Sequence, residues 1–152
     1  MLKINLKLGE ILQLESEING LVNQESGKII YEGFLKQNLS IILKYGLNEL
    51  SELLKNERKK VEVLRDELIK KYGEENNEGG IFVKMYDEIE DEEGNVVGKK
   101  FNEKYLKFEE EYSVFLNVEK EIEYPEITKE DLKDSGKSND DYRILFKLIR
   151  KD

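Results

Sequence analysis

With 152 residues, the chain is long enough for one domain to bury a hydrophobic core without disulfides or metal ions. It contains no cysteine and no histidine, which excludes disulfide bonds, thiolate nucleophiles, zinc fingers and imidazole acid–base catalysis. Its 34 acidic and 25 basic residues give a net charge of −9, which repels the phosphates of DNA and RNA and favours a basic partner or none. We therefore expect a single domain, residues 1–152, that does not bind nucleic acid directly.

The apolar residues are spaced periodically, which is typical of a folded chain. No apolar run approaches the roughly 18 residues that a membrane-spanning helix needs. The absence of cysteine also fits a reducing compartment. These features predict a cytoplasmic protein without a membrane partner.

Alternating apolar residues at Leu2, Ile4 and Leu6 predict a short strand or extended lead at the start of the chain. From Leu8 the apolar spacing becomes helical. The polar segment from Asn23 to Gly27 then predicts the end of this first helix.

A long helix is predicted from about Ile30 to Tyr72, where the spacing is helical and proline is absent. Gly33 and Gly46 are the positions at which it could kink or break. The long helix carries an apolar stripe whose residues are three or four positions apart, with Glu57 at the one position where an apolar residue is missing. Such a stripe needs a partner helix. The stripe consists of Leu43, Leu47, Leu50, Leu54, Val61, Leu64 and Leu68.

A second helix with the same spacing is predicted over FNEKYLKFEEEYSVFLNVE, and its stripe is aromatic. We expect the two stripes to pack together in an antiparallel helical hairpin. Two alternatives remain open, namely that both stripes face a mixed core, or that the long helix associates with a second copy. The aromatic stripe consists of Phe101, Tyr105, Phe108, Tyr112 and Phe115.

Between these helices, residues 81–98 are predicted to form a β-hairpin insert, with Gly94 and Asn95 in its turn. The segment EKEIEYPEI predicts a short strand that ends at Pro125. Thr128 and Asp131 predict the cap of a short helical turn, a loop follows over KDSGKSNDD, and a terminal helix is predicted over DYRILFKLIR, with Tyr142, Leu145, Phe146 and Ile149 on one face. The predicted fold class is α+β and mostly helical.

The stretch Asp87–Gly98, DEIEDEEGNVVG, is the candidate functional site because it begins with six carboxylates in seven residues. It could be the solvated tip of the hairpin, a surface that binds a basic partner protein, or a metal site. A basic cluster at Lys55–Lys60 argues against a uniformly acidic surface, and is expected to pair with nearby glutamates. The candidate partner-binding residues are Asp87, Glu88, Glu90, Asp91, Glu92 and Glu93.

Motifs for metals, phosphates and catalysis are incomplete in this sequence. A calcium loop counted from Gly94 would begin at Ile89 and end at Lys100, neither of which is a suitable ligand. GKS at Gly136–Ser138 has Asp131 where a phosphate-binding loop needs its first glycine. The carboxylate spacing of a nucleotide pyrophosphatase's magnesium site also occurs here, but among glycines and asparagines and not on facing helices. The matching residues are Glu74, Glu75, Glu78, Glu88 and Asp91. We therefore expect no enzymatic activity, no cofactor and no metal.

The order of segments resembles a family of small phage and prophage proteins of unknown function from low-GC Gram-positive bacteria. The resemblance covers about Leu50 to Leu132. It implies a small phage accessory protein in the cytoplasm of a host cell, and it supplies no catalytic residues. The corresponding segments are Leu68–Gly73, Phe101–Glu103, Phe115–Ile122 and Ile127–Leu132.

Two functions follow as hypotheses. The first is a non-enzymatic inhibitor of a host defence system, which either offers its acidic surface to a basic nucleic-acid-binding effector or sequesters a nucleotide. Sequestration would use Lys55, Arg58, Lys59 or Arg143 together with stacking tyrosines such as Tyr142. The second is a virion-assembly or tail-associated structural protein that associates with itself through its helical stripes.

Overall fold

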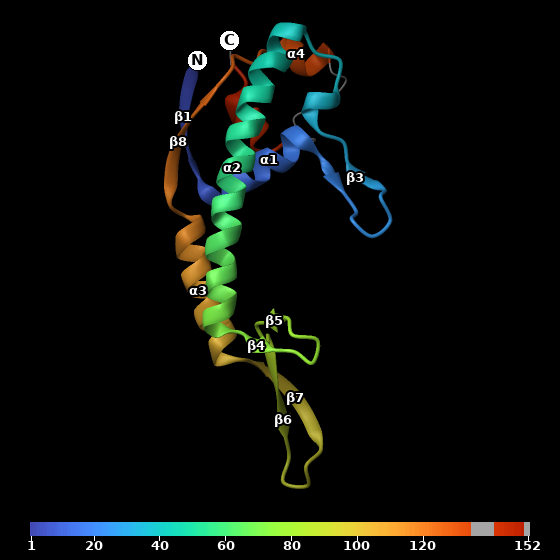
Figure 1. Ribbon diagram of the computed structural model, residues 1–152, viewed down its shortest axis with the longest axis vertical. Coiled ribbons are helices and arrows are strands. Elements are labelled where there is room, and N and C mark those ends of the chain that lie inside the picture. Colours follow the sequence, from blue (N-terminus) through green and yellow to red (C-terminus); the bar gives the residue numbers. More distant parts are fainter. Residues whose placement is uncertain (135–141, 151–152) are drawn as a thin grey trace. The chain divides into compact units, whose positions relative to one another are not determined.

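The computed structural model describes residues 1–134 and 142–150 (Figure 1). The chain divides into two compact units. Unit 1 comprises Met1–Lys59 and Val118–Asp152, and unit 2 comprises Lys60–Asn117. The fold is α+β and mostly helical, with one long helix and small antiparallel hairpins, which confirms the predicted fold class. The prediction of a single domain stays a prediction.

Unit 1 contains a two-stranded antiparallel sheet, in which β1 (Leu2–Lys7) pairs with β8 (Glu119–Tyr124). Both strands lie where the alternation of apolar residues predicts them. α1 (Leu8–Asn19) follows β1 directly, and the Glu10 carboxylate accepts the Lys7 N–H at 3.1 Å in its first turn. Gly20, with φ +84°, ends α1 a few residues earlier than predicted.

The segment after α1 is a small hairpin, in which β2 (Leu21–Val22) pairs with β3 (Ile29–Tyr31), and not the start of a long helix. The prediction of a helix from Ile30 is therefore wrong for the residues before Ile41. The Asn23 side chain accepts the N–H groups of Glu25 and Ser26 at 2.9 and 3.1 Å and closes a turn that helical spacing does not reveal. η1 (Phe34–Lys36) and then the long helix follow.

The long helix α2 spans Ile41–Tyr72 and contributes to both units. Its first four stripe leucines, from Leu43 to Leu54, are buried and belong to unit 1. The aromatic helix α3 (Glu103–Leu116) belongs to unit 2, together with only the last three stripe residues of α2. The predicted packing of the leucine stripe on the aromatic helix is therefore limited to the last part of α2, because the stripe is shared between two cores.

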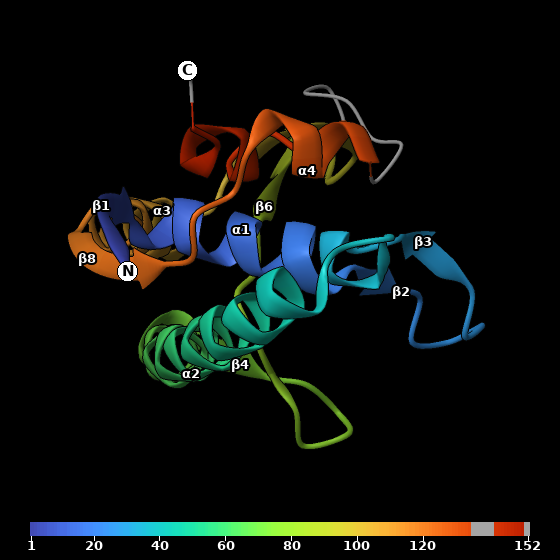
Figure 2. The ribbon, with the colours of Figure 1, turned by 90° about the horizontal axis from the view of Figure 1, so that it is seen from above.

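α1 lies between α2 on one side and the C-terminal segment on the other (Figure 2). That segment contains α4 (Lys129–Asp134), whose start is capped as predicted. The Thr128 N–H donates to the Asp131 carboxylate at 2.8 Å, and the Asp131 N–H donates to the Thr128 hydroxyl at 3.2 Å. Most of the predicted loop, including GKS at Gly136–Ser138, lies outside the described residues.

The predicted terminal helix is replaced by a short 3₁₀ helix, η2 (Leu145–Leu148), so that prediction is wrong. The backbone N–H groups of Ile144 and Leu145 donate to the buried carboxylate of Glu17 in α1, at 2.9 and 3.2 Å. A side chain on α1 therefore binds the N–H groups at the start of η2, an interaction that local sequence spacing cannot indicate. Burial raises the pKa of Glu17, while these two N–H donors act in the opposite direction.

The raised pKa of Glu17 predicts a pH dependence of stability. In the unfolded chain a glutamate ionises near the reference value of about 4.3. Between that value and the higher pKa in the fold, the folded chain binds more protons than the unfolded chain, so the free energy of unfolding falls as the pH rises. We expect urea unfolding between pH 4 and pH 8 to give Glu17→Gln an increasing stability relative to the wild type. The exposed control Gln24→Ala removes no titrating group, so it should differ from the wild type by a constant amount. The same constant offset for Glu17→Gln would contradict the prediction.

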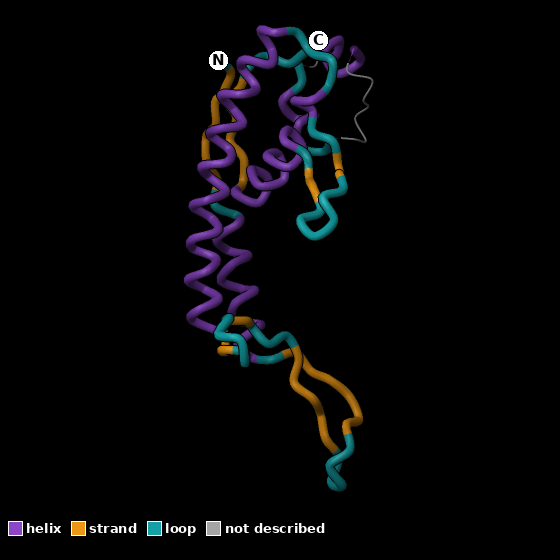
Figure 3. The backbone as a smooth tube through the Cα atoms, turned by 45° about the vertical axis from the view of Figure 1, so that its right-hand side comes forward, coloured by secondary structure: helices purple, strands orange, loops and turns teal. Residues whose placement is uncertain are grey.

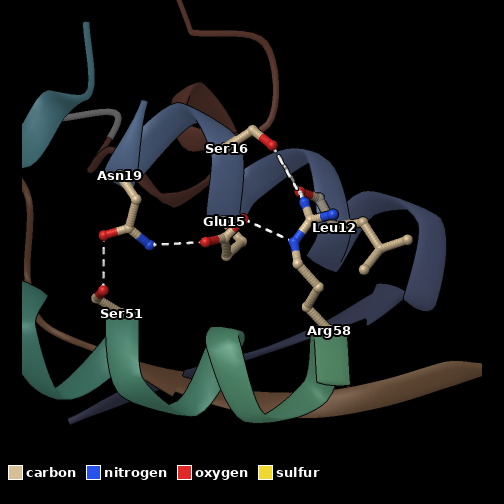
Figure 4. A network of polar contacts seen from close by, with 6 residues as sticks. All are labelled: Leu12, Glu15, Ser16, Asn19, Ser51 and Arg58. Carbon is tan, nitrogen blue, oxygen red and sulfur yellow. Dashed lines mark hydrogen bonds and ion pairs between the residues drawn. The ribbon is translucent and has the colours of Figure 1, made fainter. Parts of the chain in front are cut away.

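α1 and α2 are also joined by a polar network within unit 1 (Figure 4). The Arg58 guanidinium of α2 donates to the Glu15 carboxylate at 2.8 Å, to the Leu12 carbonyl at 2.7 Å and to the Ser16 hydroxyl at 3.1 Å. Asn19 extends the network, since its amide donates to Glu15 and its carbonyl accepts the Ser51 hydroxyl at 2.7 Å.

Arg58→Ala is expected to lower the free energy of unfolding by about 2 kcal/mol, because the Glu15 carboxylate, only 13% exposed, loses its charged partner. Urea unfolding followed by circular dichroism measures the change. Lys59→Ala is the matched control, since Lys59 is the exposed neighbour on the same helix, and its effect should stay within about 0.5 kcal/mol. Equal effects of the two substitutions would mean that the network does not stabilise unit 1.

In unit 2, the last part of α2 and the aromatic helix α3 run antiparallel and side by side (Figures 1 and 3). The Tyr72 hydroxyl donates to the Glu111 carboxylate at 2.7 Å, and Lys71 lies 3.3 Å from the same carboxylate. Four strands lie between the two helices in sequence. β4 (Glu74–Glu75) pairs with β5 (Ile81–Phe82), and β6 (Tyr86–Glu90) pairs with β7 (Val96–Phe101).

Candidate protein-binding surface

The predicted hairpin insert is a two-stranded ribbon, β6–β7, that extends away from the helices of unit 2 (Figure 3). Its strands pair in register from Tyr86 opposite Phe101 to Glu90 opposite Val96, with a bulge next to Ile89. The prediction of a hairpin is borne out at its turn but not at its first strand. Phe82, which lies within the predicted insert of residues 81–98, pairs with Glu74 of β4 instead.

The turn of the ribbon is held by one of the candidate acidic residues. The Asp91 carboxylate accepts the backbone N–H groups of Glu93 and Asn95, both at 2.9 Å. These hydrogen bonds lower the pKa of Asp91, with the N–H of Asn95 making the largest contribution. Gly94 has φ +83°, the left-handed conformation that this turn requires and that glycine adopts without strain. Asp91 therefore has a structural role in the turn.

Asp87 is a second structural carboxylate. Its side chain accepts a hydrogen bond from the Asn102 amide at 2.9 Å and lies 3.8 Å from the Lys84 ammonium. Asn102 in turn caps α3 by accepting the N–H groups of Lys104 and Tyr105. Asp87 therefore links the base of the ribbon to the first turn of the helix.

The other four candidate residues leave their carboxylates exposed. Glu88 and Glu90 alternate along β6 and share one face of the ribbon with Tyr86. Glu92 and Glu93 lie in the turn, and both are exposed. Of the six predicted partner-binding residues, the structure thus brings four to an accessible surface. We call these four residues, Glu88, Glu90, Glu92 and Glu93, the acidic face.

Lysines on β7 lie opposite two of the acids, a feature that the sequence reasoning missed. Lys100 is the register partner of Asp87, and Lys99 is the register partner of Glu88. Opposite charges at facing positions stabilise an antiparallel pair modestly. Counting residues back from the turn would have paired Asp87 with Lys99 and Glu88 with Gly98, because the sequence does not reveal the bulge that shifts the register by one residue.

A row of aromatic rings lies at the base of the ribbon. Tyr86 stacks on Phe101 with ring centroids 5.0 Å apart, and Phe101 stacks on Tyr105 of α3 at 5.9 Å. Tyr86 and Phe101 are 43% and 51% exposed, so the rings present apolar surface beside the acidic face. The sequence placed Phe101 in the helical stripe, whereas the structure places it in β7.

The edge of β6 borders a groove of about 410 Å³, lined by Lys84, Tyr86, Asp87, Glu88, Glu90 and Lys99. Both signs of charge and one aromatic ring therefore meet at this edge. Such a groove can hold an extended chain that carries positive side chains. Within residues 1–134 and 142–150, no three carboxylates come close enough together to hold a metal ion.

Two of the residues proposed for nucleotide capture, Arg58 and Tyr142, are not open to a ligand. Arg58 is bound by Glu15 and by the Leu12 carbonyl, and Tyr142 is only 1% exposed. Tyr142 packs edge-on against Phe34, at 5.2 Å between ring centroids, so its ring is not available to stack on a base. The prediction of a stacking role for Tyr142 is wrong because this side chain belongs to the core of unit 1.

No helix in the described part of the chain combines the length and apolar character needed to cross a bilayer. Comparisons with family models, with curated proteins and with solved structures found no match. The resemblance to small phage proteins therefore stays a prediction, and the candidate surface is defined by its own geometry: a ribbon with four exposed carboxylates beside a row of aromatic rings.

Proposed function

We propose that the protein is a phage accessory protein that acts by binding, as a non-enzymatic inhibitor of a basic, nucleic-acid-binding effector of host defence. The observation that carries the proposal is the acidic face on the β6–β7 ribbon, whose four carboxylates are exposed. The resemblance to phage proteins supports the biological setting. The net charge of −9 supports a basic partner.

Electrostatics supports this function in two ways. Exposed carboxylates attract a basic groove over a distance of about 10 Å at moderate salt, which speeds association. The structural carboxylates Asp87 and Asp91 keep the ribbon and its turn ordered, so the acidic face is held ready before the partner arrives. Order in the free protein reduces the entropy lost on binding.

The experiment that tests this function is affinity capture from a phage-infected host at low and high salt, followed by mass spectrometry. The wild type is compared with a variant in which the four residues of the acidic face are replaced by lysine. A matched control carries the same charge change at four exposed acids elsewhere, Glu25, Glu32, Glu49 and Glu52. A nucleic-acid-binding defence protein captured by the wild type and the control, but not by the face variant, supports the proposal. Equal capture by all three contradicts it.

A structural role in virion assembly is the second candidate. It is favoured by a groove of about 410 Å³ in unit 2, lined by residues of α2 and α3 that include Leu64, Leu68 and Phe115. Val63 and Val114 leave further apolar surface exposed on these helices, at 59% and 67%. An assembly protein should associate with itself and co-purify with particles, so a strictly monomeric chain that is absent from virions would exclude this role.

A further inference from the structure

We propose that the open edge of β6 binds an extended basic segment of the partner as an added β-strand. This inference rests on the proposed function, and it specifies the partner's chemistry and the geometry of the contact. The segment would be a strand with lysine or arginine at alternate positions. Strand addition of this kind is a general way in which an exposed sheet edge recognises a peptide.

The hydrogen-bond pattern of the ribbon determines which backbone groups are available. The Asn102 N–H donates to the Met85 carbonyl at 2.9 Å, so these two residues form a hydrogen-bonded pair. Pairs alternate along an antiparallel ladder between those that exchange hydrogen bonds across the strands and those that do not. Tyr86 and Glu88 therefore occupy the second kind of pair, and their N–H and C=O groups point away from β7.

The groove described above lies over the face of the ribbon beside this edge, since Tyr86, Glu88 and Glu90 line it together with Lys99 of β7. A strand added here would place every second side chain beside one of these three residues. Basic side chains would meet Glu88 and Glu90, and an apolar side chain would meet the exposed Tyr86 ring. Hydrogen bonds to the backbone of β6 would bind a strand of any sequence, and the side chains of Glu88 and Glu90 would favour a basic one.

The charge on the edge decides between candidate occupants. A second copy of β6 would bring its own Glu88 and Glu90 against those of the first, and facing like charges are destabilising. A nucleic acid strand is repelled for the same reason. The groove is lined by three carboxylates and two lysines, and Glu92 and Glu93 add exposed negative charge in the turn. The ribbon therefore complements a basic strand, which is the occupant that we assign.

Two substitutions of Glu88 separate the contribution of its backbone N–H to the binding affinity from the contribution of its charge. Glu88→Thr removes the carboxylate and keeps the outward N–H. Glu88→Pro removes both, and proline is tolerated on an edge strand where its missing N–H faces solvent. The probe is a fluorescent peptide, acetyl-Lys-Val-Lys-Val-Lys-Val-Lys-amide, and binding is followed by anisotropy. We expect a loss of affinity of a few-fold for Glu88→Thr, and a further loss of about tenfold for Glu88→Pro.

A second arm leaves the protein unchanged, so that its outcome does not depend on the folding of a variant. The same peptide is N-methylated at alternate residues along one edge, which keeps its charge and removes its hydrogen-bond donors. We expect it to bind about tenfold more weakly than the parent peptide. Equal binding of the two peptides would overturn strand addition and leave a purely electrostatic contact. That result leaves the proposed function standing, whereas the capture experiment with the face variant tests that function directly.

Discussion

Replacing Glu88, Glu90, Glu92 and Glu93 by lysine is expected to weaken binding of the basic partner by about 100-fold at low salt. This loss corresponds to about 0.7 kcal/mol for each exposed charge, which is within the usual range for charges at the rim of an interface. The four side chains are exposed, and only the modest pairing of Glu88 with the facing Lys99 is lost within the ribbon, so the variant should fold normally. Titration calorimetry with the captured partner measures the effect.

Salt provides an internal check on this result. The affinity of the wild type should fall steeply between about 0.05 M and 0.5 M salt, because screening weakens attraction between exposed charges. The face variant should lose most of this dependence. The control with lysines at Glu25, Glu32, Glu49 and Glu52 should keep most of the affinity and a similar slope. If this control loses as much affinity as the face variant, only the total charge matters and the ribbon is not the binding site.

Charge reversal at Asp87 or Asp91 would be a poor test of binding, although both belong to the acidic stretch. Asp91 accepts two backbone N–H groups in the turn, and Asp87 accepts the side-chain amide of Asn102. Lysine at either position would remove these hydrogen bonds and disorder the ribbon. A loss of binding would then follow from unfolding of the ribbon as well as from the change in charge.

Phe34→Ala is expected to lower the free energy of unfolding by about 4 kcal/mol. Phe34 is fully buried, and its ring packs edge-on against Tyr142 at 5.2 Å between centroids. The truncation leaves a cavity between η1 and the C-terminal segment, whose backbone cannot close it without losing the hydrogen bonds to Glu17. Urea unfolding followed by circular dichroism measures the loss.

Ile30→Ala is the matched control for this prediction, because Ile30 is a large apolar residue that is 66% exposed in the neighbouring hairpin. Its effect should stay below about 0.5 kcal/mol. If Phe34→Ala costs no more than Ile30→Ala, then the ring does not anchor the C-terminal segment. Binding of the basic partner should be unchanged in both variants that remain folded, since neither residue lies in the ribbon.

Features that depend on neighbouring residues in the sequence could be predicted. The alternation of Leu2, Ile4 and Leu6 identified β1, and the spacing of Thr128 and Asp131 identified the start of α4. Gly94 identified the turn of the ribbon because the turn needs a positive φ, which glycine adopts without strain. In each case the interaction joins residues a few positions apart.

Features that depend on distant residues could not be predicted. Glu17 binds the N–H groups at the start of η2 from more than a hundred positions away, and no local pattern announces this pairing. The apolar stripe on α2 looked like one seam because the spacing of Leu43 and Val61 does not reveal that they belong to different units. Within the candidate site, composition identified the acids, but only their hydrogen bonds separated the structural Asp87 and Asp91 from the exposed acidic face.

Hydrogen exchange of the protein alone and in complex with the captured partner locates the binding surface without any substitution. We expect amide protection to increase over Tyr86–Phe101, and most at the outward N–H groups of Tyr86 and Glu88. Protection that appears instead on the groove lined by Leu64 and Phe115, with the ribbon unchanged, would contradict the account and favour a role in assembly.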